Sequence, residues 1–576
     1  MVKKNKVSKQ QHHQKMDTSA ASGITSSVGV FALLFIVSIL SALYNRIIDC
    51  DEYMNYWEPT HFLMYNKGFQ TWEYSPTYSL RSYAYLLIHS SIGKLLEFIS
   101  NGNKATLFFL IKISIGLLSS LSQTVFYNGI KKRFGESIAN YTLVFMLLSP
   151  AFFLSTTTYL PTTFSMTALM AGYGCWMLDY SFASVLFCCV SVFLGWPFVG
   201  VLCIPLGLNV LYHRGLLKMI GYLVSSVLLV FVPMVAIDYR YYGKLVIAIL
   251  NIVAYNFTDD HSGGSQLYGI ESWTFYFINA FVNFNVVFVM SCLTLPLVVM
   301  FYKYKWSKAS LGYSLLVLMP YYLWFSFMTY LPHKEERFLF VVYPFICLAG
   351  AVSLSYVLNI IESTINWMFG KGGKGLSRFL CFSFILVFSL LSVSRIYSTY
   401  VNYTAPIDLF VYLNNNVLNN GNLTPSSSST SKQDIDICVG KEWHRFPSNY
   451  FIPNDNQHFN FNLRFIESEF KGHLPKPFST HPNATSIIPS NMNDQNKQEF
   501  DRYIKEEDCD YLIDFDSPSQ KEVHYVDDTL RWKIIYSLPF LDISQTHSPL
   551  RAFFIPFYSK NINHYSPYYI LKNIEK

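Results

Sequence analysis

Four acidic residues follow the first long apolar segment of the chain, and their spacing raises the possibility of proton-transfer chemistry. In the stretch DCDEYMNYWEP, Asp49, Asp51 and Glu52 lie close together and Glu58 precedes Pro59. A carboxylate can act as general base on a hydroxyl nucleophile. The simpler interpretation is a hydrated cap on a membrane helix, which requires no catalysis.

Aromatic residues alternate with these acids. Trp57 lies beside Glu58, and Trp72 and Tyr74 follow a few residues later. Aromatic faces cover the apolar sides of sugar rings, and carboxylates accept hydrogen bonds from sugar hydroxyls. The stretch therefore favours a carbohydrate contact through Trp57, Glu58, Trp72 and Tyr74, although structural packing explains the aromatic residues equally well.

A basic cluster occurs later, in LPHKEERFLF at residues 331–340. His333, Lys334 and Arg337 offer cationic donors, and such groups suit phosphate oxygens or lipid headgroups. Fixed cations can stabilise a leaving phosphate without a metal. Because no acidic pair is typical of a metal–diphosphate site and no C-x-x-C pair occurs, we predict no metal.

Long apolar segments must position these groups. The 576-residue chain is 51% hydrophobic and only 14% charged, which indicates a polytopic membrane protein and not a soluble one. We predict a basic tail over 1–26 and a transmembrane region over 27–400. About eleven spans are expected, at 27–47, 105–126, 138–158, 163–179, 182–195, 197–212, 216–237, 276–301, 309–331, 338–360 and 378–400.

The sidedness of these spans depends on residues 81–99. This segment is apolar but contains Arg81, His89, Lys94 and Glu97, and charges are costly within a bilayer. We interpret it as an interfacial helix of a first loop covering 48–104. Basic clusters at 131–133, 213–214, 302–307 and 371–378 then share the cytosolic side with the N-terminus. The acids, the loop 238–275, the HKEER turn and the C-terminal region share the opposite side.

The region 401–576 is no longer membrane-like and predicts a small α/β domain. It has a low-complexity insertion at about 414–433, and IDICVG, DYLIDF and WKIIYSLPF are typical of strands. In an oxidising compartment Cys438 and Cys509 could pair, which spacing alone does not decide. Glycosylation triplets at Asn256, Asn402 and Asn483 fit a lumenal side but also arise by chance.

Two motifs resemble one enzyme family. DCDEYMNYWEPTHFLMYNKGFQTWEYSPTYSLRSYAYLLIHS is similar to the first lumenal loop of the endoplasmic-reticulum α-1,2-mannosyltransferases of glycosyltransferase family 22, and HKEERFLF matches their HKEERF signature. The resemblance covers roughly residues 27–400. It implies the polytopic GT-C fold and dolichyl-phosphate mannose as donor. NYWEPTHFLMYNKGFQTWEYSP most resembles the N-glycan enzymes that add the seventh and ninth mannoses.

The resemblance implies roles for individual residues. Asp51 is expected to be the base that takes the proton from the acceptor mannose 2-hydroxyl, with Glu52 and Asp49 as reserve candidates. His333, Lys334 and Arg337 would face the donor phosphate. The β-linked donor and the α product imply inversion by a single displacement, without a covalent sugar–enzyme intermediate.

The resemblance also implies the surroundings of the reaction. No cofactor is expected beyond the lipid-linked donor. The expected partners are dolichyl-phosphate mannose, the dolichyl-diphosphate-linked oligosaccharide and membrane lipids, with no nucleic acid. The expected location is the endoplasmic-reticulum membrane, with a cytosolic N-terminus and a lumenal C-terminal domain.

Several alternatives remain open at this point. Related mannosyltransferases build α-1,6 branches or extend glycosylphosphatidylinositol anchors. A transporter would be expected to show internal repeats and ionisable residues deep within its spans, and neither is prominent in this chain. A non-catalytic scaffold would tolerate loss of Asp51.

Overall fold

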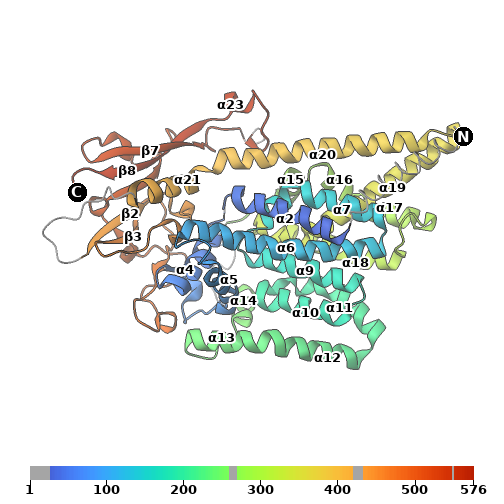
Figure 1. Cartoon of the computed structure of the whole chain (residues 1–576), viewed down its shortest axis with the longest axis horizontal. Helices are drawn as coiled ribbons and strands as arrows, with labels where there is room; N and C mark the ends of the chain where they lie inside the picture. Colours follow the sequence, from blue (N-terminus) through green and yellow to red (C-terminus); the bar gives the residue numbers. More distant parts are fainter. Residues whose placement is uncertain (1–25, 48, 258–268, 420–431, 548–550) are drawn as a thin grey trace, which may run out of the picture.

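The computed structural model describes residues 26–47, 49–257, 269–419, 432–547 and 551–576. A long helical bundle occupies one end of the molecule and a domain built on a β-sheet occupies the other (Figure 1). The predicted basic tail lies outside the described residues, apart from Ser26.

Six described helices are long and apolar enough to cross a membrane, and one bent helix pair provides a seventh candidate. The chain is therefore a multi-pass membrane protein. The six are Ser27–Tyr44 (α2), Lys104–Arg133 (α6), Leu216–Tyr242 (α12 and α13), Leu311–Tyr330 (α18), Glu336–Phe369 (ending in α19) and Gly373–Tyr403 (α20). The bent pair joins Val286–Cys292 (α16) to Thr294–Tyr304, which begins with α17.

Fewer than eleven of the described helices are long enough to span singly, because several of the predicted spans are broken into shorter helices. The predicted span 138–158 divides into Glu136–Leu148 (α7) and Pro150–Ser155 (α8), since Pro150 has no backbone N–H to continue the helix. The predicted span 276–301 divides at Asn285, whose φ of 40° interrupts the helix after Phe275–Phe284 (α15). The remaining bundle helices are Pro161–Met177 (α9), Ser181–Val190 (α10) and Gly200–Arg214 (α11).

The first loop contains the helix Tyr83–Leu96 (α5), and the loop 238–275 contains the helix Ala248–Phe257 (α14). The segment interpreted as interfacial forms α5, which at about 21 Å is too short to cross a hydrocarbon core of about 30 Å. Its buried face includes Tyr83, Tyr85 and His89. Within the predicted loop 238–275, α14 is an element that sequence reasoning missed.

Basic residues gather at the end of the bundle away from the sheet. Lys132 and Arg133 both pair with Asp179, and Arg214 donates to Ser181. The α11–α12 and α19–α20 turns lie at this same end, far from the strands (Figure 1). The arrangement agrees with the predicted grouping of basic clusters on one side.

A six-stranded mixed sheet forms the core of the C-terminal domain, in the order β5-β3-β2-β6-β8-β7. Its four parallel strands are β2, β3, β5 and β6, and β8 and β7 extend the sheet in antiparallel fashion. The bounds are Gln433–Val439 (β2), Phe459–Ile466 (β3), Tyr503–Ile504 (β5), Tyr511–Phe515 (β6), Trp532–Leu541 (β7) and Tyr565–Asn573 (β8). The three predicted strands are present.

A disulfide joins Cys438 of β2 to Cys509, just before β6. The two strands are neighbours in the sheet, and the Cα atoms lie 5.9 Å apart, within the usual range for a disulfide. Both ends of the predicted insertion belong to regular elements. Residues up to Leu418 form a helical turn that continues Ala405–Tyr412 (α21), and Gln433 begins β2. Residues 420–431 lie outside the described part of the chain.

The glycosylation triplets have different surroundings. Asn402 is buried and accepts a hydrogen bond from the Tyr565 hydroxyl at 2.8 Å, so it is not available to carry a glycan in the folded chain. Asn483 is exposed. The triplet at Asn256 includes Thr258, which lies outside the described residues.

The C-terminal domain is fastened to the first loop. Phe69–Gln70 (β1) pairs antiparallel with Lys476–Pro477 (β4), and the ring of Phe62 stacks on that of Phe478 with centroids 3.9 Å apart. Glu58, at the start of Glu58–Tyr65 (α4), accepts four hydrogen bonds. The donors are the Phe69 amide, the Ser448 hydroxyl, and the backbone and side-chain amides of Asn449. This buried carboxylate therefore fixes the position of the domain relative to the membrane bundle.

Candidate active site

The acidic motif folds as a short helix capped by its own first acid. The Asp49 side chain accepts a hydrogen bond from the Asp51 amide at 2.9 Å and so caps Cys50–Glu52 (α3). Capping by aspartate satisfies an otherwise unpaired helix N–H. As a result, Asp49 and Asp51 project from one turn, at the end of the bundle that faces the C-terminal domain.

The HKEER turn meets these acids. Arg337 Nη2 lies 2.5 Å from Asp51 Oδ2, and Arg337 Nη1 lies 3.2 Å from Asp49 Oδ2. Arg337 Nε contacts Glu335 of its own turn. The sequence-based expectation that the two motifs share one side of the membrane therefore has direct geometric support.

These contacts separate the two aspartates electrostatically. Burial raises the pKa of Asp49 to about 7, with Asp51 and Glu335 adding to the shift and Arg337 opposing it. Burial acts in the same direction on Asp51, but Arg337 and Arg81 outweigh it and hold the pKa of Asp51 below its usual value. Asp51 is therefore ionised at neutral pH, whereas Asp49 titrates near neutrality.

A cavity of about 640 Å³ opens over this cluster. Its volume lies in the range typical of small-molecule sites. Of the residues singled out in the sequence, Asp49, Asp51, Trp72, His333 and Arg337 line it. His333 Nε2 lies 3.0 Å from Glu335 Oε1, and this hydrogen bond raises the pKa of His333, which favours its charged form.

Two acids of the motif lie away from the cavity. Glu52 is buried and accepts hydrogen bonds from the Trp57 indole and the Tyr159 amide. Glu58 anchors the C-terminal domain, as described above. The expectations of Glu52 as a reserve base and of Glu58 as an acceptor contact therefore lack geometric support, and both carboxylates serve the packing of the loop.

Three further candidates have packing roles in this structure. Trp57 is fully buried against Phe108 and Tyr159. Tyr74 is buried and donates to the Asn55 carbonyl at 2.8 Å. Lys334 directs its ammonium group to the backbone carbonyls of Glu271 and Leu331 and does not line the cavity.

Arg81 is a cavity residue that sequence reasoning did not assign. Its guanidinium makes two hydrogen bonds to Glu73, at 2.9 and 3.1 Å, and lies over the Tyr56 ring. The available signal was a charged residue at the start of a largely apolar segment, which entered the sequence analysis only as an argument against a membrane span.

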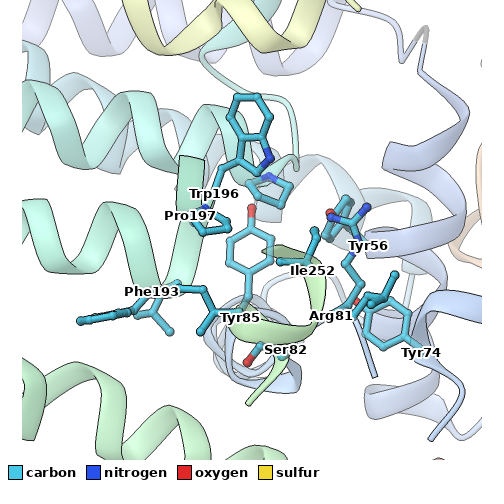
Figure 2. A pocket seen from close by; sticks show the side chains of 15 residues that line it. Tyr56, Tyr74, Arg81, Ser82, Tyr85, Phe193, Trp196, Pro197 and Ile252 are labelled. Carbon is cyan, nitrogen blue, oxygen red and sulfur yellow. The ribbon is translucent and has the colours of Figure 1, made fainter. Parts of the chain in front are cut away.

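Arg81 also borders a second, smaller cavity of about 40 Å³. Figure 2 shows Arg81 beside Tyr56, with Tyr85 and Ile252 between it and the Trp196 side of the cavity. Phe193 and Leu194 add apolar lining, and Tyr56, Arg81 and Trp196 border both cavities. The Arg81 guanidinium thus lies where the two cavities adjoin.

The C-terminal domain contributes aromatic residues to the larger cavity, which sequence reasoning also missed. Trp443 follows β2 and Phe470 follows β3, and both line the cavity with His473. These residues lie about 400 positions from the acids in sequence, so no local pattern could connect them.

The acidic turn also has the composition of a cation site. One ligand atom from each of Asp49, Cys50 and Asp51 lies within 4.8 Å of the others. The Arg337 guanidinium, however, already contacts both carboxylates and supplies the positive charge there. A metal would have to compete with this fixed cation, so the donor set is poorly suited to one.

Known proteins resemble this chain in sequence over most of its length. Residues 29–453 match the Alg9-like mannosyltransferase family. Human alpha-1,2-mannosyltransferase ALG9 is 39% identical over 98% of this chain and 92% of its own length. GPI mannosyltransferase 3 of Debaryomyces hansenii is 25% identical over 72% of this chain and 73% of its own length.

The fold has a solved counterpart. ArnT from Cupriavidus metallidurans bound to undecaprenyl phosphate superimposes with a TM-score of 0.51 at 11% identity, covering 90% of this chain and 96% of ArnT. This similarity shows a common GT-C-type membrane architecture. From the family match and the extent of the sequence similarity, the chain belongs to the Alg9-like mannosyltransferase family.

Proposed function

We infer that the chain is an α-1,2-mannosyltransferase of N-glycan precursor assembly, and we propose dolichyl-phosphate mannose as its donor. The acceptor would be the dolichyl-diphosphate-linked high-mannose oligosaccharide. The observation that carries the proposal is the contact of Arg337 with Asp51 and Asp49 at the floor of one cavity. The curated relatives named alpha-1,2-mannosyltransferase match over nearly the whole chain, which supports the same reaction.

Asp51 acts as the general base in this proposal. Its carboxylate accepts the proton of the acceptor mannose 2-hydroxyl while that oxygen attacks C1 of the donor mannose. The bond between C1 and the phosphate oxygen breaks, and dolichyl phosphate leaves with the electron pair. A single displacement of this kind converts the β-linked donor into an α-linked product. The lowered pKa of Asp51 keeps its carboxylate ionised and able to accept a proton, and it also makes that carboxylate a weaker base.

Cations around the cavity stabilise the leaving phosphate. Arg337 is held by three carboxylates, so Arg81 and protonated His333 are the better placed groups to face the phosphate oxygens. Arg81 has the additional feature of lying where the two cavities adjoin. Lys334, occupied by backbone carbonyls, is left out of this role.

The proposed location is the endoplasmic-reticulum membrane, with a cytosolic N-terminus and a lumenal C-terminal domain. Grouping of the basic clusters at the opposite end of the bundle supports this orientation. A disulfide in the C-terminal domain agrees with an oxidising compartment. Both substrates carry polyisoprenoid tails, so their reactive heads would reach the acids from the bilayer surface.

Other activities are less well supported. GPI mannosyltransferase 3 of Debaryomyces hansenii is 25% identical, against 39% for human ALG9, and its match covers less of this chain. A transporter would place its ionisable residues along a path through the bundle, whereas Asp49, Asp51, Arg81 and Arg337 meet at one end.

The test is a transfer assay with purified protein, dolichyl-phosphate mannose and defined lipid-linked glycans, followed by linkage analysis. The expected product has one new α-1,2-linked mannose. An α-1,6 product, or no transfer to any glycan by a folded protein, would contradict the proposal. Activity should persist in excess chelator, and loss of activity that Mn²⁺ restores would overturn the metal-independent mechanism.

A further inference from the structure

Two aromatic side chains of the C-terminal domain form one wall of the cavity. Trp443 and Phe470 follow β2 and β3, which are parallel neighbours, so the loops at their carboxyl ends meet. The two ring centroids lie 4.5 Å apart at an interplanar angle of 38°. Both side chains are only partly buried, and both border the cavity that contains Asp51.

The local backbone holds this pair in place. A side chain at Gly472 would bring a Cβ atom within 2.2 Å of the Phe470 ring and 2.7 Å of Asn496 Oδ1, so the ring folds back over the glycine. Asn496 Oδ1 accepts a hydrogen bond from the His473 amide at 2.9 Å, which ties the same loop to a neighbouring segment. The aromatic surface is therefore a fixed feature and does not depend on a freely moving loop.

The pair also has a fixed position relative to the acids. Glu58 lies only a few residues after Asp51, and its hydrogen bonds to Ser448 and Asn449 hold the segment that follows Trp443. Pairing of β1 with β4 holds the segment after Phe470 in the same way. Two separate attachments thus set the distance between the aromatic wall and the catalytic acids.

Packing alone does not account for Trp443. Its ring is half-buried, and its indole N–H has no hydrogen-bond partner among the described residues. An aromatic face with a free N–H donor offers both features that pyranose rings require, namely an apolar surface for C–H groups and a partner for a hydroxyl.

We propose that Trp443 and Phe470 form the platform on which a mannose ring of the acceptor glycan rests. This inference relies on the proposed mannosyltransferase function and assigns the acceptor side of its cavity. The donor sugar is tethered to the bilayer through a single phosphate, and the proposed function places that phosphate by Arg81. The acceptor is a larger glycan that projects away from the membrane, toward the domain that carries the two rings.

The test compares steady-state kinetics of Trp443→Ala and Phe470→Ala with the unmodified protein, using dolichyl-phosphate mannose and a dolichyl-diphosphate-linked oligomannose acceptor. The acceptor KM is expected to rise roughly five- to fiftyfold. The donor KM should stay within about twofold of that of the unmodified protein, a margin of about 0.4 kcal/mol. Trp443→Phe, which keeps an aromatic face, should restore most of the acceptor affinity.

A matched control comes from the same domain. Phe500 is 73% exposed and does not line the cavity, so Phe500→Ala should leave both KM values unchanged. If Trp443→Ala fails to fold, Trp443→Leu keeps apolar volume without a ring and should show the same rise in acceptor KM.

The outcomes distinguish failure of the aromatic platform from failure of the mannosyltransferase function. If the unmodified protein transfers mannose but the ring variants keep the acceptor KM within twofold, or raise the donor KM equally, the platform is wrong and the mannosyltransferase function stands. If the unmodified protein, shown to be folded, transfers mannose to no glycan, the proposed function fails and the platform fails with it.

Discussion

Arg337 donates a hydrogen bond to Asp51 across 286 residues of sequence, with Nη2 2.5 Å from Oδ2. The same guanidinium reaches Asp49, so one arginine organises both acids of the first loop. Its charge keeps Asp51 ionised while burial leaves Asp49 near its titration point. Two neighbouring carboxylates with different pKa values are a common arrangement at sites of proton transfer.

The pKa of Asp49 predicts a pH dependence of the reaction. Below about pH 7 Asp49 is protonated, and above it the added negative charge raises the basicity of Asp51. We therefore expect kcat to rise with pH through an inflection near 7. Measurement of kcat over pH 5.5–8.5 tests this, and Asp49→Asn should abolish the inflection. A flat wild-type profile would show that Asp49 does not titrate there.

Much of this site could be predicted from local sequence. The acids and the HKEER turn were identified as motifs, and their shared side followed from the interpretation of residues 81–99 as non-spanning. The roles of Trp57 and Glu58 could not be predicted from sequence. Composition does not distinguish an aromatic or acidic side chain that faces a cavity from one that faces the core. Burial of Glu58 depends on Asn449, almost 400 residues away.

Prediction of the fold from local sequence is limited in the same way. Apolar composition located most membrane segments. The break at Pro150 has a local cause that the sequence contained, whereas the break at Asn285 and the short helix α14 carry no comparable local signal. Strands β2, β6 and β7 were recognised from their apolar runs. In contrast, β3 was missed although FNFNLRFI alternates apolar and polar residues, which is the pattern of a half-buried strand.

Arg81 is predicted to bind the donor phosphate. Arg81→Ala should raise the donor KM roughly tenfold or more, since a charge-assisted hydrogen bond contributes about 1.5–3 kcal/mol. Arg81→Lys should recover part of the affinity. The acceptor KM should change little in either variant. Arg464→Ala, on β3 and outside the cavity, is the matched control. An acceptor-specific defect in Arg81→Ala would assign this residue to the other substrate.

Glu58 is predicted to hold the C-terminal domain in position. Glu58→Ala leaves four buried donors without their acceptor and should lower the free energy of unfolding by about 2–4 kcal/mol. Thermal unfolding and limited proteolysis near β4 report the change. Glu575→Ala, at an exposed acid near the C-terminus, should have no effect. Unchanged stability and protease resistance in Glu58→Ala would contradict the anchoring role.

The disulfide should stabilise the sheet of the C-terminal domain. Peptide mapping without reductant is expected to recover Cys438 and Cys509 in one cross-linked species. Replacing both by alanine should cost about 2–4 kcal/mol of stability. Cys292→Ala, at an exposed free thiol, is the control. Recovery of both Cys438 and Cys509 as free thiols would exclude the bond.

The role of Asp51 as the base is the central claim, and single-turnover transfer by Asp51→Asn tests it most directly. Asparagine keeps the shape of the side chain but cannot accept the proton, so the rate should fall about 10²–10⁴-fold. Asp527→Asn, at an exposed acid of the C-terminal domain, should behave as the unmodified protein. The account predicts loss of transfer by an Asp51→Asn protein that remains folded and membrane-inserted, and a rate within twofold of that of the unmodified protein would contradict it.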